Sequence, residues 1–268
     1  MLELLAFPFM QRALLAGVLL GTLLALIGIF VVLKRMAFMS DGIAHASLSG
    51  AAIGILTGND PLLTAIFFSG IFGALIAYFE RKTKISSDAI IGLVFTTGMA
   101  LGILLLSFGT GYRPELTTFL FGSILSIKWS EILIMAVFAL LIGVFILPKY
   151  KKIALFILNE ETAFASGIKI ETYRVLLYVV IAISVVLGIK MLGIILVSAL
   201  LIVPVTTAKL LSHSFRGLIV TSLIVSNLTV LLGLIASVIL NLPTGATIVI
   251  CGMLIFLLAA MYGKLARR

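Results

Sequence analysis

The sequence predicts an all-α, polytopic helical membrane protein with eight or nine spans, on three observations. Hydrophobic residues make up 62% of the 268 residues and charged residues only 11%, whereas a soluble domain carries roughly 25% charged residues. The mean hydropathy is +1.33. Apolar runs of about 20 residues, enough to cross roughly 30 Å of hydrocarbon as a helix, recur along the chain. No stretch of soluble-domain size separates them, so we expect one transmembrane domain over residues 1–268.

Nine apolar segments are candidate spans. They cover residues 10–33, 40–57, 61–79, 89–108, 130–147, 172–189, 191–211, 216–240 and 244–263. The sixth and seventh are separated only by a short stretch around Lys190 and Gly193, and one bent helix over both would reduce the count to eight. Residues 116–127 are apolar but too short to cross, so we interpret them as a re-entrant or interfacial piece. Glycines four residues apart, such as Gly98 and Gly102, favour close helix packing in lipid.

Basic residues gather in alternate connections between these segments. They are Lys34, Arg35, Arg81, Lys82, Lys84, Lys149, Lys151, Lys152, Lys209, Arg216, Lys264, Arg267 and Arg268. Because cytoplasmic loops carry an excess of Lys and Arg, this pattern predicts a multi-pass protein of the cytoplasmic membrane with its N-terminus outside and its C-terminus inside. These loops account for the net charge of +9, which therefore does not indicate nucleic-acid binding.

Several chemistries have no motif in the sequence. Cys251 is the only cysteine, which excludes a disulfide framework and a thiolate metal site. The N-terminus lacks a basic leader with a small-residue cleavage site, so we expect no removable signal peptide. No Gly-x-x-x-x-Gly-Lys-Ser/Thr loop occurs, since Gly263-Lys264 is followed by Leu265, and no hydrolase or metalloprotease motif occurs either. We therefore expect no enzyme activity in this chain.

Asp41 and His45 are the leading candidates for a functional site, because both are ionisable and lie one helical turn apart inside a predicted span. Placing a charge at membrane depth costs roughly 2.5–3.5 kcal/mol, so such a residue is a functional hypothesis by default. Spacing of four residues puts both side chains on one helical face, with Cβ atoms about 5–6 Å apart. Carboxylate oxygen and imidazole nitrogen bind zinc and also suit manganese or iron. The pair cannot complete a metal's ligand shell, so other ligands must come from other helices or from water.

Two other roles for this pair stay open on the residues alone. Asp41, beside Ser40, fits a hydrogen-bonded cap at a helix start. The pair also fits a proton relay of the kind found in secondary transporters. A metal role requires an ionised carboxylate and a neutral imidazole, so it predicts weaker transport in acid.

Two asparagines are weaker candidates for further metal ligands. Asn227 is polar within the eighth segment and either faces a pathway or makes an interhelical hydrogen bond. Asn241 opens the turn that Pro243 and Gly245 mark between the last two segments. The other histidine, His213, lies in a turn on the inner side, where we expect solvent to surround it.

Residues 159–168 predict a short helix within the longest cytoplasmic connection. Asn159 fits the N-cap, Glu160 and Glu161 place acids in the first turn, and Gly167 fits the stop. Such a helix either docks onto another protein or lies inert against the membrane.

Residues 36–50, Met-Ala-Phe-Met-Ser-Asp-Gly-Ile-Ala-His-Ala-Ser-Leu-Ser-Gly, resemble the signature of the permease subunits of bacterial zinc/manganese/iron ABC importers. In that family an Asp and a His share the second helix. Four further segments are similar to family segments in the same order, at residues 88–95, 121–126, 160–167 and 193–204. The resemblance therefore covers nearly the whole chain.

This resemblance implies a type II ABC-importer-like transmembrane domain. The expected partners are a second permease copy in a homodimer, cytoplasmic ATPase subunits that hydrolyse ATP, an extracellular metal-binding protein and membrane lipid. The segment at about 159–168 would be the coupling helix, with ATPase-coupling residues Glu160, Glu161, Ala163, Ser166 and Gly167. Asp41 and His45 carry over as a transient metal site, whereas Asn241 departs from the Asp that similar sequences often have there. No tightly bound cofactor is expected, only the transported metal ion.

The function that we expect is inward transport of a divalent transition metal. The same oxygen and nitrogen ligands serve zinc, manganese and iron, so the sequence does not choose among them. Two alternatives stay open, a proton-coupled secondary cation transporter that uses Asp41 and His45, and an importer of a larger metal chelate.

Overall fold

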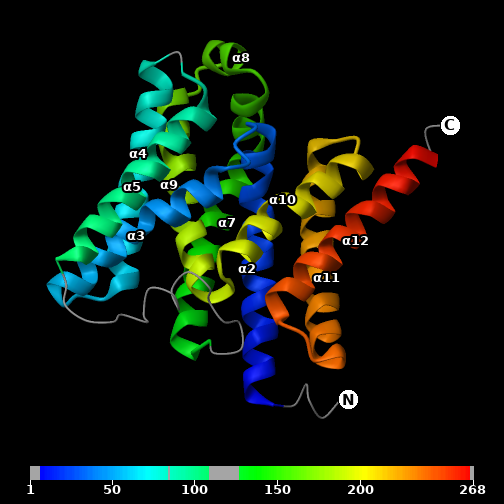
Figure 1. Ribbon diagram of the computed structural model, residues 1–268. Helices are drawn as coiled ribbons and strands as arrows, with labels where there is room; N and C mark the ends of the chain where they lie inside the picture. Colours follow the sequence, from blue (N-terminus) through cyan, green and yellow to red (C-terminus); the bar gives the residue numbers. More distant parts are fainter. Residues whose placement is uncertain (1–6, 84, 109–126, 266–268) are drawn as a thin grey trace. The chain divides into compact units, whose positions relative to one another are not determined.

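The computed structural model describes residues 7–83, 85–108 and 127–265. All regular secondary structure in those ranges is α-helical (Figure 1), which confirms the predicted fold class. The chain forms two compact units. Unit 1 comprises Met1–Leu33, Ser123–Phe145 and Met191–Arg268, and unit 2 comprises Lys34–Gly122 and Ile146–Lys190. The single transmembrane domain over residues 1–268 stays a prediction.

Unit 1 contains four long helices that pack against one another. Helix α2 (Pro8–Leu33) packs against α10 (Ile194–Leu211) and α11 (Phe215–Leu240), and α12 (Thr244–Leu265) packs against α10 and α11. The approach of α2 to α10 is close, because a Cβ added at Gly28 would lie 2.0 Å from the carbonyl oxygen of Leu201. The hydroxyl of Ser226 donates a 2.8 Å hydrogen bond to the carbonyl of Gly21. Small residues and hydroxyl groups thus hold these helices together, as is common in lipid.

Unit 2 is organised around α3 (Met39–Thr57), which packs against α4 (Pro61–Lys82) and α5 (Ser87–Ser107). The turn between α3 and α4 follows from local chemistry. Gly58 takes a φ of 72°, in the left-handed region, where glycine has no steric penalty. The carboxylate of Asp60 then accepts hydrogen bonds from the backbone N–H groups of Leu62 and Leu63 at 2.8 and 3.0 Å. Asp60 is therefore an N-cap that starts α4.

Two further long helices have residues in both units. Helix α7 (Trp129–Leu158) passes from unit 1 to unit 2 and contains Pro148, and α9 (Ile170–Leu192) ends in unit 1. Gly193 separates α9 from α10 with a φ of 78°. Because that conformation breaks the helix, the stretch from Thr172 to Leu211 forms two helices and not one bent helix.

Each of the nine predicted segments falls in a long helix of the residues that the structure describes. Eight helices have the length and hydropathy of membrane spans. Helix α3 is the ninth; its 19 residues extend about 28 Å, but its polar residues lower its hydropathy. Figure 1 shows α2 beginning at one end of unit 1 and α12 ending at the other. The chain is a multi-pass protein of the cytoplasmic membrane. The predicted re-entrant piece at residues 116–127 lies outside the described residues except for Ile127.

The predicted short helix is present as α8 (Glu160–Ala165). The side chain of Asn159 caps it by accepting a 2.9 Å hydrogen bond from the backbone N–H of Thr162. Gly167 ends the turn with a φ of 75°. Local capping chemistry therefore defines both ends of α8.

Candidate functional site

Asp41 and His45 lie in the first two turns of α3, in unit 2. The helix begins at Met39, its N-cap is Phe38, and Asp41 lies inside the first turn. Asp41 is therefore not the residue at the cap position, although its carboxylate lies where the positive end of the helix dipole favours a negative charge. Both side chains are half-buried. Their spacing places them on the same face of α3.

The imidazole of His45 is held by an aromatic neighbour. The ring of Phe95, on α5, meets it edge to face, with centroids 5.1 Å apart and an interplanar angle of 83°. Nδ1 of His45 is buried and has no hydrogen-bond partner among the described residues. Leaving a buried polar atom unpaired costs about 1–3 kcal/mol. The ring is thus fixed in orientation while one nitrogen lone pair or N–H remains available to a ligand.

Helix α5 comes close to this face of α3 because glycines line the contact. A Cβ added at Gly42, next to Asp41, would lie 2.4 Å from Cγ2 of Ile91, and one added at Gly98 would lie 2.7 Å from Cα of Ala46. Such small residues let two helix backbones approach in lipid. The glycines therefore set the position of α5, and with it the position of Phe95 against His45.

The two candidate asparagines lie in unit 1, on and at the end of α11. The side-chain amide of Asn227 donates hydrogen bonds to Oγ1 of Thr22 on α2 at 3.1 Å and to the carbonyl of Leu223 at 2.9 Å. Its Oδ1 is buried with no partner in the described part of the chain. Asn241 is exposed and ends α11 with a φ of 52°, a conformation that Asn tolerates better than most residues. Asn227 thus joins two helices and Asn241 caps one.

The remaining histidine, His213, is exposed in the turn between α10 and α11, as expected. Within the described ranges no group of three or more His, Cys, Asp or Glu side chains is arranged to hold a metal ion. Asp41 and His45, whose side chains are of types that can bind a metal, lie on one helical face as a pair and not as part of a larger ligand group in the described ranges.

The predicted coupling residues occupy α8 and its C-terminal turn. Ala163 is fully buried, whereas Glu161, Ser166 and Gly167 are exposed. The Ser166 hydroxyl donates to the carbonyl of Thr162. Glu160 accepts hydrogen bonds from Lys34 and Arg174. The buried Ala163 and the paired Glu160 fix α8 to unit 2 and leave its other face open.

Two residues near these sites, Phe95 and Arg174, were not predicted from the sequence. Phe95, which orients His45, closes the segment at residues 88–95, but an apolar residue in a span gives no sign of its contact. Arg174, which binds Glu160, lies one turn into a predicted span, and a cation at that depth is the signal that identifies it. Neither contact follows from sequence spacing.

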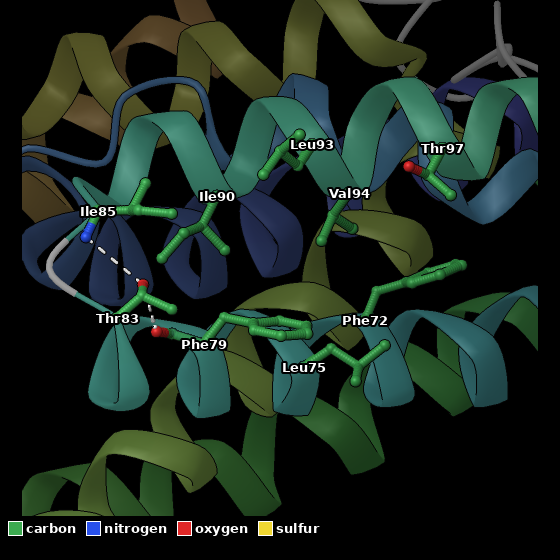
Figure 2. Close-up of a pocket in the computed structure, with 9 residues that line it drawn as sticks. All are labelled: Phe72, Leu75, Phe79, Thr83, Ile85, Ile90, Leu93, Val94 and Thr97. Atoms are coloured by element: carbon green, nitrogen blue, oxygen red, sulfur yellow. Dashed lines mark hydrogen bonds between the residues drawn. The ribbon is translucent and has the colours of Figure 1, made fainter.

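A separate cavity lies between α4 and α5 of unit 2 (Figure 2). Its volume is about 360 Å³, and it is lined by Phe72, Leu75, Phe79, Thr83, Ile85, Ile90, Leu93, Val94 and Thr97. None of these side chains is titratable. The cavity therefore has no ligand for a metal ion and is distinct from the pair on α3.

The chain matches a known protein family and several of its members. The model of the ABC 3 transport family matches residues 6–263. The manganese transport system membrane protein MntC of Listeria monocytogenes is 32% identical, over 97% of this chain and 92% of its own length. The high-affinity zinc uptake system membrane protein ZnuB of Haemophilus influenzae is 27% identical, over 94% of this chain and 97% of its own.

A solved structure agrees with this match. The structure of PsaBC from Streptococcus pneumoniae in complex with Fab superposes with a TM-score of 0.83 and 30% sequence identity, covering 96% of this chain and 93% of that chain. The family match, the helical fold and the ordered sequence segments point the same way, and the chain belongs to the ABC 3 transport family.

Proposed function

We propose that this chain is the membrane permease of an ATP-driven importer that carries a divalent transition metal ion, zinc, manganese or iron, into the cytoplasm. The family match over residues 6–263 supports a permease role. Relatives named for manganese transport and for zinc uptake support a metal as the cargo.

The observation that carries the proposal is the half-buried pair on α3. Asp41 supplies carboxylate oxygen and His45 supplies an imidazole whose Nδ1 is buried without a partner among the described residues. Phe95 holds the ring edge to face, so little reorientation is needed to bind an ion. Oxygen and nitrogen donors at this spacing suit all three metals.

The small number of ligands from this helix suits transport better than storage. Conduction requires a site that binds well enough to admit the ion and weakly enough to release it. Two ligands on one helix leave the rest of the shell to water or to other elements. A conformational change that alters those other ligands then releases the ion.

Energy for transport is expected from separate ATPase subunits, because the sequence has no nucleotide-binding loop. Helix α8 is the proposed docking element for them. Its Phe164 side chain is 75% exposed, and exposed aromatic residues are common anchors of protein interfaces. A second permease copy and an extracellular metal-binding protein complete the proposed assembly.

Two other functions fit the pair less well. A proton-coupled secondary transporter would use Asp41 and His45 as a relay, but membership in an ABC transport family favours ATP as the energy source. An importer of a larger chelate would not require a carboxylate and an imidazole that can bind a bare ion. We therefore place the metal ion first.

The test of this function is the source of energy. The assembled complex, with ATPase and binding protein, is placed in vesicles that hold ATP inside and zinc, manganese or ferrous iron outside. We expect uptake that stops when ATP is replaced by a non-hydrolysable analogue and continues with a proton uncoupler. Uptake that is independent of ATP and is abolished by the uncoupler would refute the proposal.

A further inference from the structure

Arg174 stands at the centre of a compact charge cluster in unit 2. The cluster comprises Lys34, Glu80, Glu160, Arg174 and Tyr178, and is called the Arg174 cluster below. Nη2 of Arg174 donates a 2.6 Å hydrogen bond to Oε2 of Glu160, and Nε lies 3.9 Å from Oε2 of Glu80. The hydroxyl of Tyr178 donates to the same carboxylate oxygen of Glu80. Two carboxylates and two cations balance within this group, and the more exposed carboxylate of Glu171 lies 3.8 Å from Nη1 of Arg174 at its edge.

Most of the cluster is shielded from solvent, although the side chain of Glu160 is 38% exposed. Arg174 is 9% exposed, and the side chains of Lys34 and Glu80 are 17% and 19% exposed. A buried charge that loses its partner is strongly penalised, whereas an exposed ion pair contributes little. Breaking a contact of Arg174 therefore costs more free energy than breaking an exposed ion pair.

Arg174 connects elements that are far apart in the sequence. Glu160 is the first residue of α8, Glu80 lies in the last turns of α4, and Arg174 itself lies in the first turns of α9. Glu160 is also bound by Lys34, whose ammonium lies 4.5 Å from the ring centroid of Phe156 on α7. The start of α8 is thereby fixed to three other parts of unit 2.

The connection continues from α4 to α5. The second carboxylate oxygen of Glu80, Oε1, accepts a 2.7 Å hydrogen bond from the hydroxyl of Ser87, the first residue of α5. Both α4 and α5 pack against α3, which carries Asp41 and His45. A continuous set of ion pairs, hydrogen bonds and packed helices thus runs from α8 to the helix of the candidate metal site, with the ion pair between Arg174 and Glu80 as the link between α9 and α4.

We infer that Arg174 is a positioning residue for energy coupling. It binds the start of α8 and the end of α4 together, so that the two helices move as a rigid body. The inference rests on the proposed function, in which ATPase subunits move α8. A displacement of α8 then pulls α4 and α5 with it and changes the surroundings of α3. Without the Arg174 bridge, α8 moves alone, and ATP is hydrolysed without metal transport.

The planar guanidinium is the part of Arg174 that matters. Its Nη2 donates to Glu160 while its Nε, which makes no hydrogen bond among the described residues, stays within ion-pair distance of Glu80. The ammonium of a lysine acts as a point charge on one atom and cannot reach both carboxylates in this way. Arg174→Lys keeps the buried positive charge and removes the bridge. Glu160→Gln keeps the shape of the partner and removes its charge, and because Glu160 is half-exposed this variant does not depend on refolding of a buried site.

A matched control comes from an exposed pair in the same unit. Nε of Arg81 lies 3.1 Å from Oε1 of Glu171, and the two side chains are 53% and 47% exposed. Oε1 of Glu171 also lies 3.8 Å from Nη1 of Arg174. Arg81→Gln therefore removes an exposed arginine–glutamate pair at the edge of the Arg174 cluster and leaves every contact of Arg174 in place. A loss that results from any missing ion pair would appear in this control as well.

The experiment measures metal ions transported per ATP hydrolysed by the assembled complex in vesicles. We expect Arg174→Lys and Glu160→Gln to lower this ratio at least about fivefold, the lower end of ordinary coupling between sites, while ATP hydrolysis persists. The ratio for Arg81→Gln should equal that of the unaltered complex.

Two results would overturn the inference. One is an unchanged ratio in Glu160→Gln; the other is a parallel fall of uptake and hydrolysis in both cluster variants, which is the pattern of a merely structural role. Failure of the proposed function is distinguishable, because the unaltered complex itself would then show no ATP-dependent metal uptake.

Discussion

At the scale of single residues, polar side chains inside the spans differ in what they already bind. The Asn227 amide is used between helices, where it donates to Thr22 and Leu223. His45 instead packs against Phe95 and keeps Nδ1 without a partner in the described part of the chain. A polar residue at membrane depth is a functional hypothesis, and its existing hydrogen bonds decide how strong that hypothesis is.

The role of Asn227 is tested by removing its interhelical hydrogen bond from either side. Thr22→Val and Asn227→Leu each delete the bond, and we expect each to lower stability by about 0.6–1.7 kcal/mol, as for other hydrogen bonds between membrane helices. Thermal unfolding in detergent measures this. Metal uptake should stay unchanged in both variants, and a loss of uptake in Asn227→Leu alone would instead assign its amide oxygen to the metal path.

At the scale of helices, the position of α3 depends on residues that have no side chain. Gly98 of α5 faces the Cα and Cβ atoms of Ala46, and Gly102 faces the backbone at Leu48 and Ser49. The four-residue spacing of these glycines predicted close packing, and the structure confirms it. The same contacts bring α5, and the ring of Phe95, against the metal-site face.

Gly98 and Gly92 provide a matched pair of substitutions on one helix. A Cβ at Gly98 would lie 2.7 Å from Ala46, whereas a Cβ at Gly92 would have nothing within 4 Å. We expect Gly98→Ala to destabilise the protein by about 1–3 kcal/mol, because backbone must move to admit the methyl group. Gly92→Ala should be neutral or stabilising by about 0.5–1 kcal/mol. Equal unfolding midpoints for the two variants would contradict this packing.

Local chemistry made much of this predictable, and distance in the chain limited the rest. The ends of α8 follow from Asn159 and Gly167, and the pairing of Asp41 with His45 follows from a spacing of four residues. The partners in the Arg174 cluster do not. Glu80 and Tyr178 are 98 residues apart, and Lys34 and Glu160 are 126 apart. Only the packing of α4, α8 and α9 in three dimensions brings them together.

At the scale of the whole molecule, membership in the ABC 3 transport family explains the combination of features. Among the described residues, eight helices are long and apolar enough to span a membrane, whereas α3 has Asp41, His45 and other polar residues in its sequence. The short α8 offers an exposed Phe164 on a segment that follows basic residues of the predicted cytoplasmic side. The chain thus joins a proposed metal site in one helix to a proposed docking helix within the same unit.

The most direct test of this account is ATP-driven metal uptake by the assembled complex carrying Asp41→Ala or His45→Ala. We expect each variant to lose at least about tenfold in uptake rate, equivalent to about 1.4 kcal/mol, while the complex still assembles and hydrolyses ATP. The Thr22→Val variant, at a polar residue that is not a candidate ligand, serves as the control. Normal uptake by both the Asp41 and the His45 variant would contradict the account.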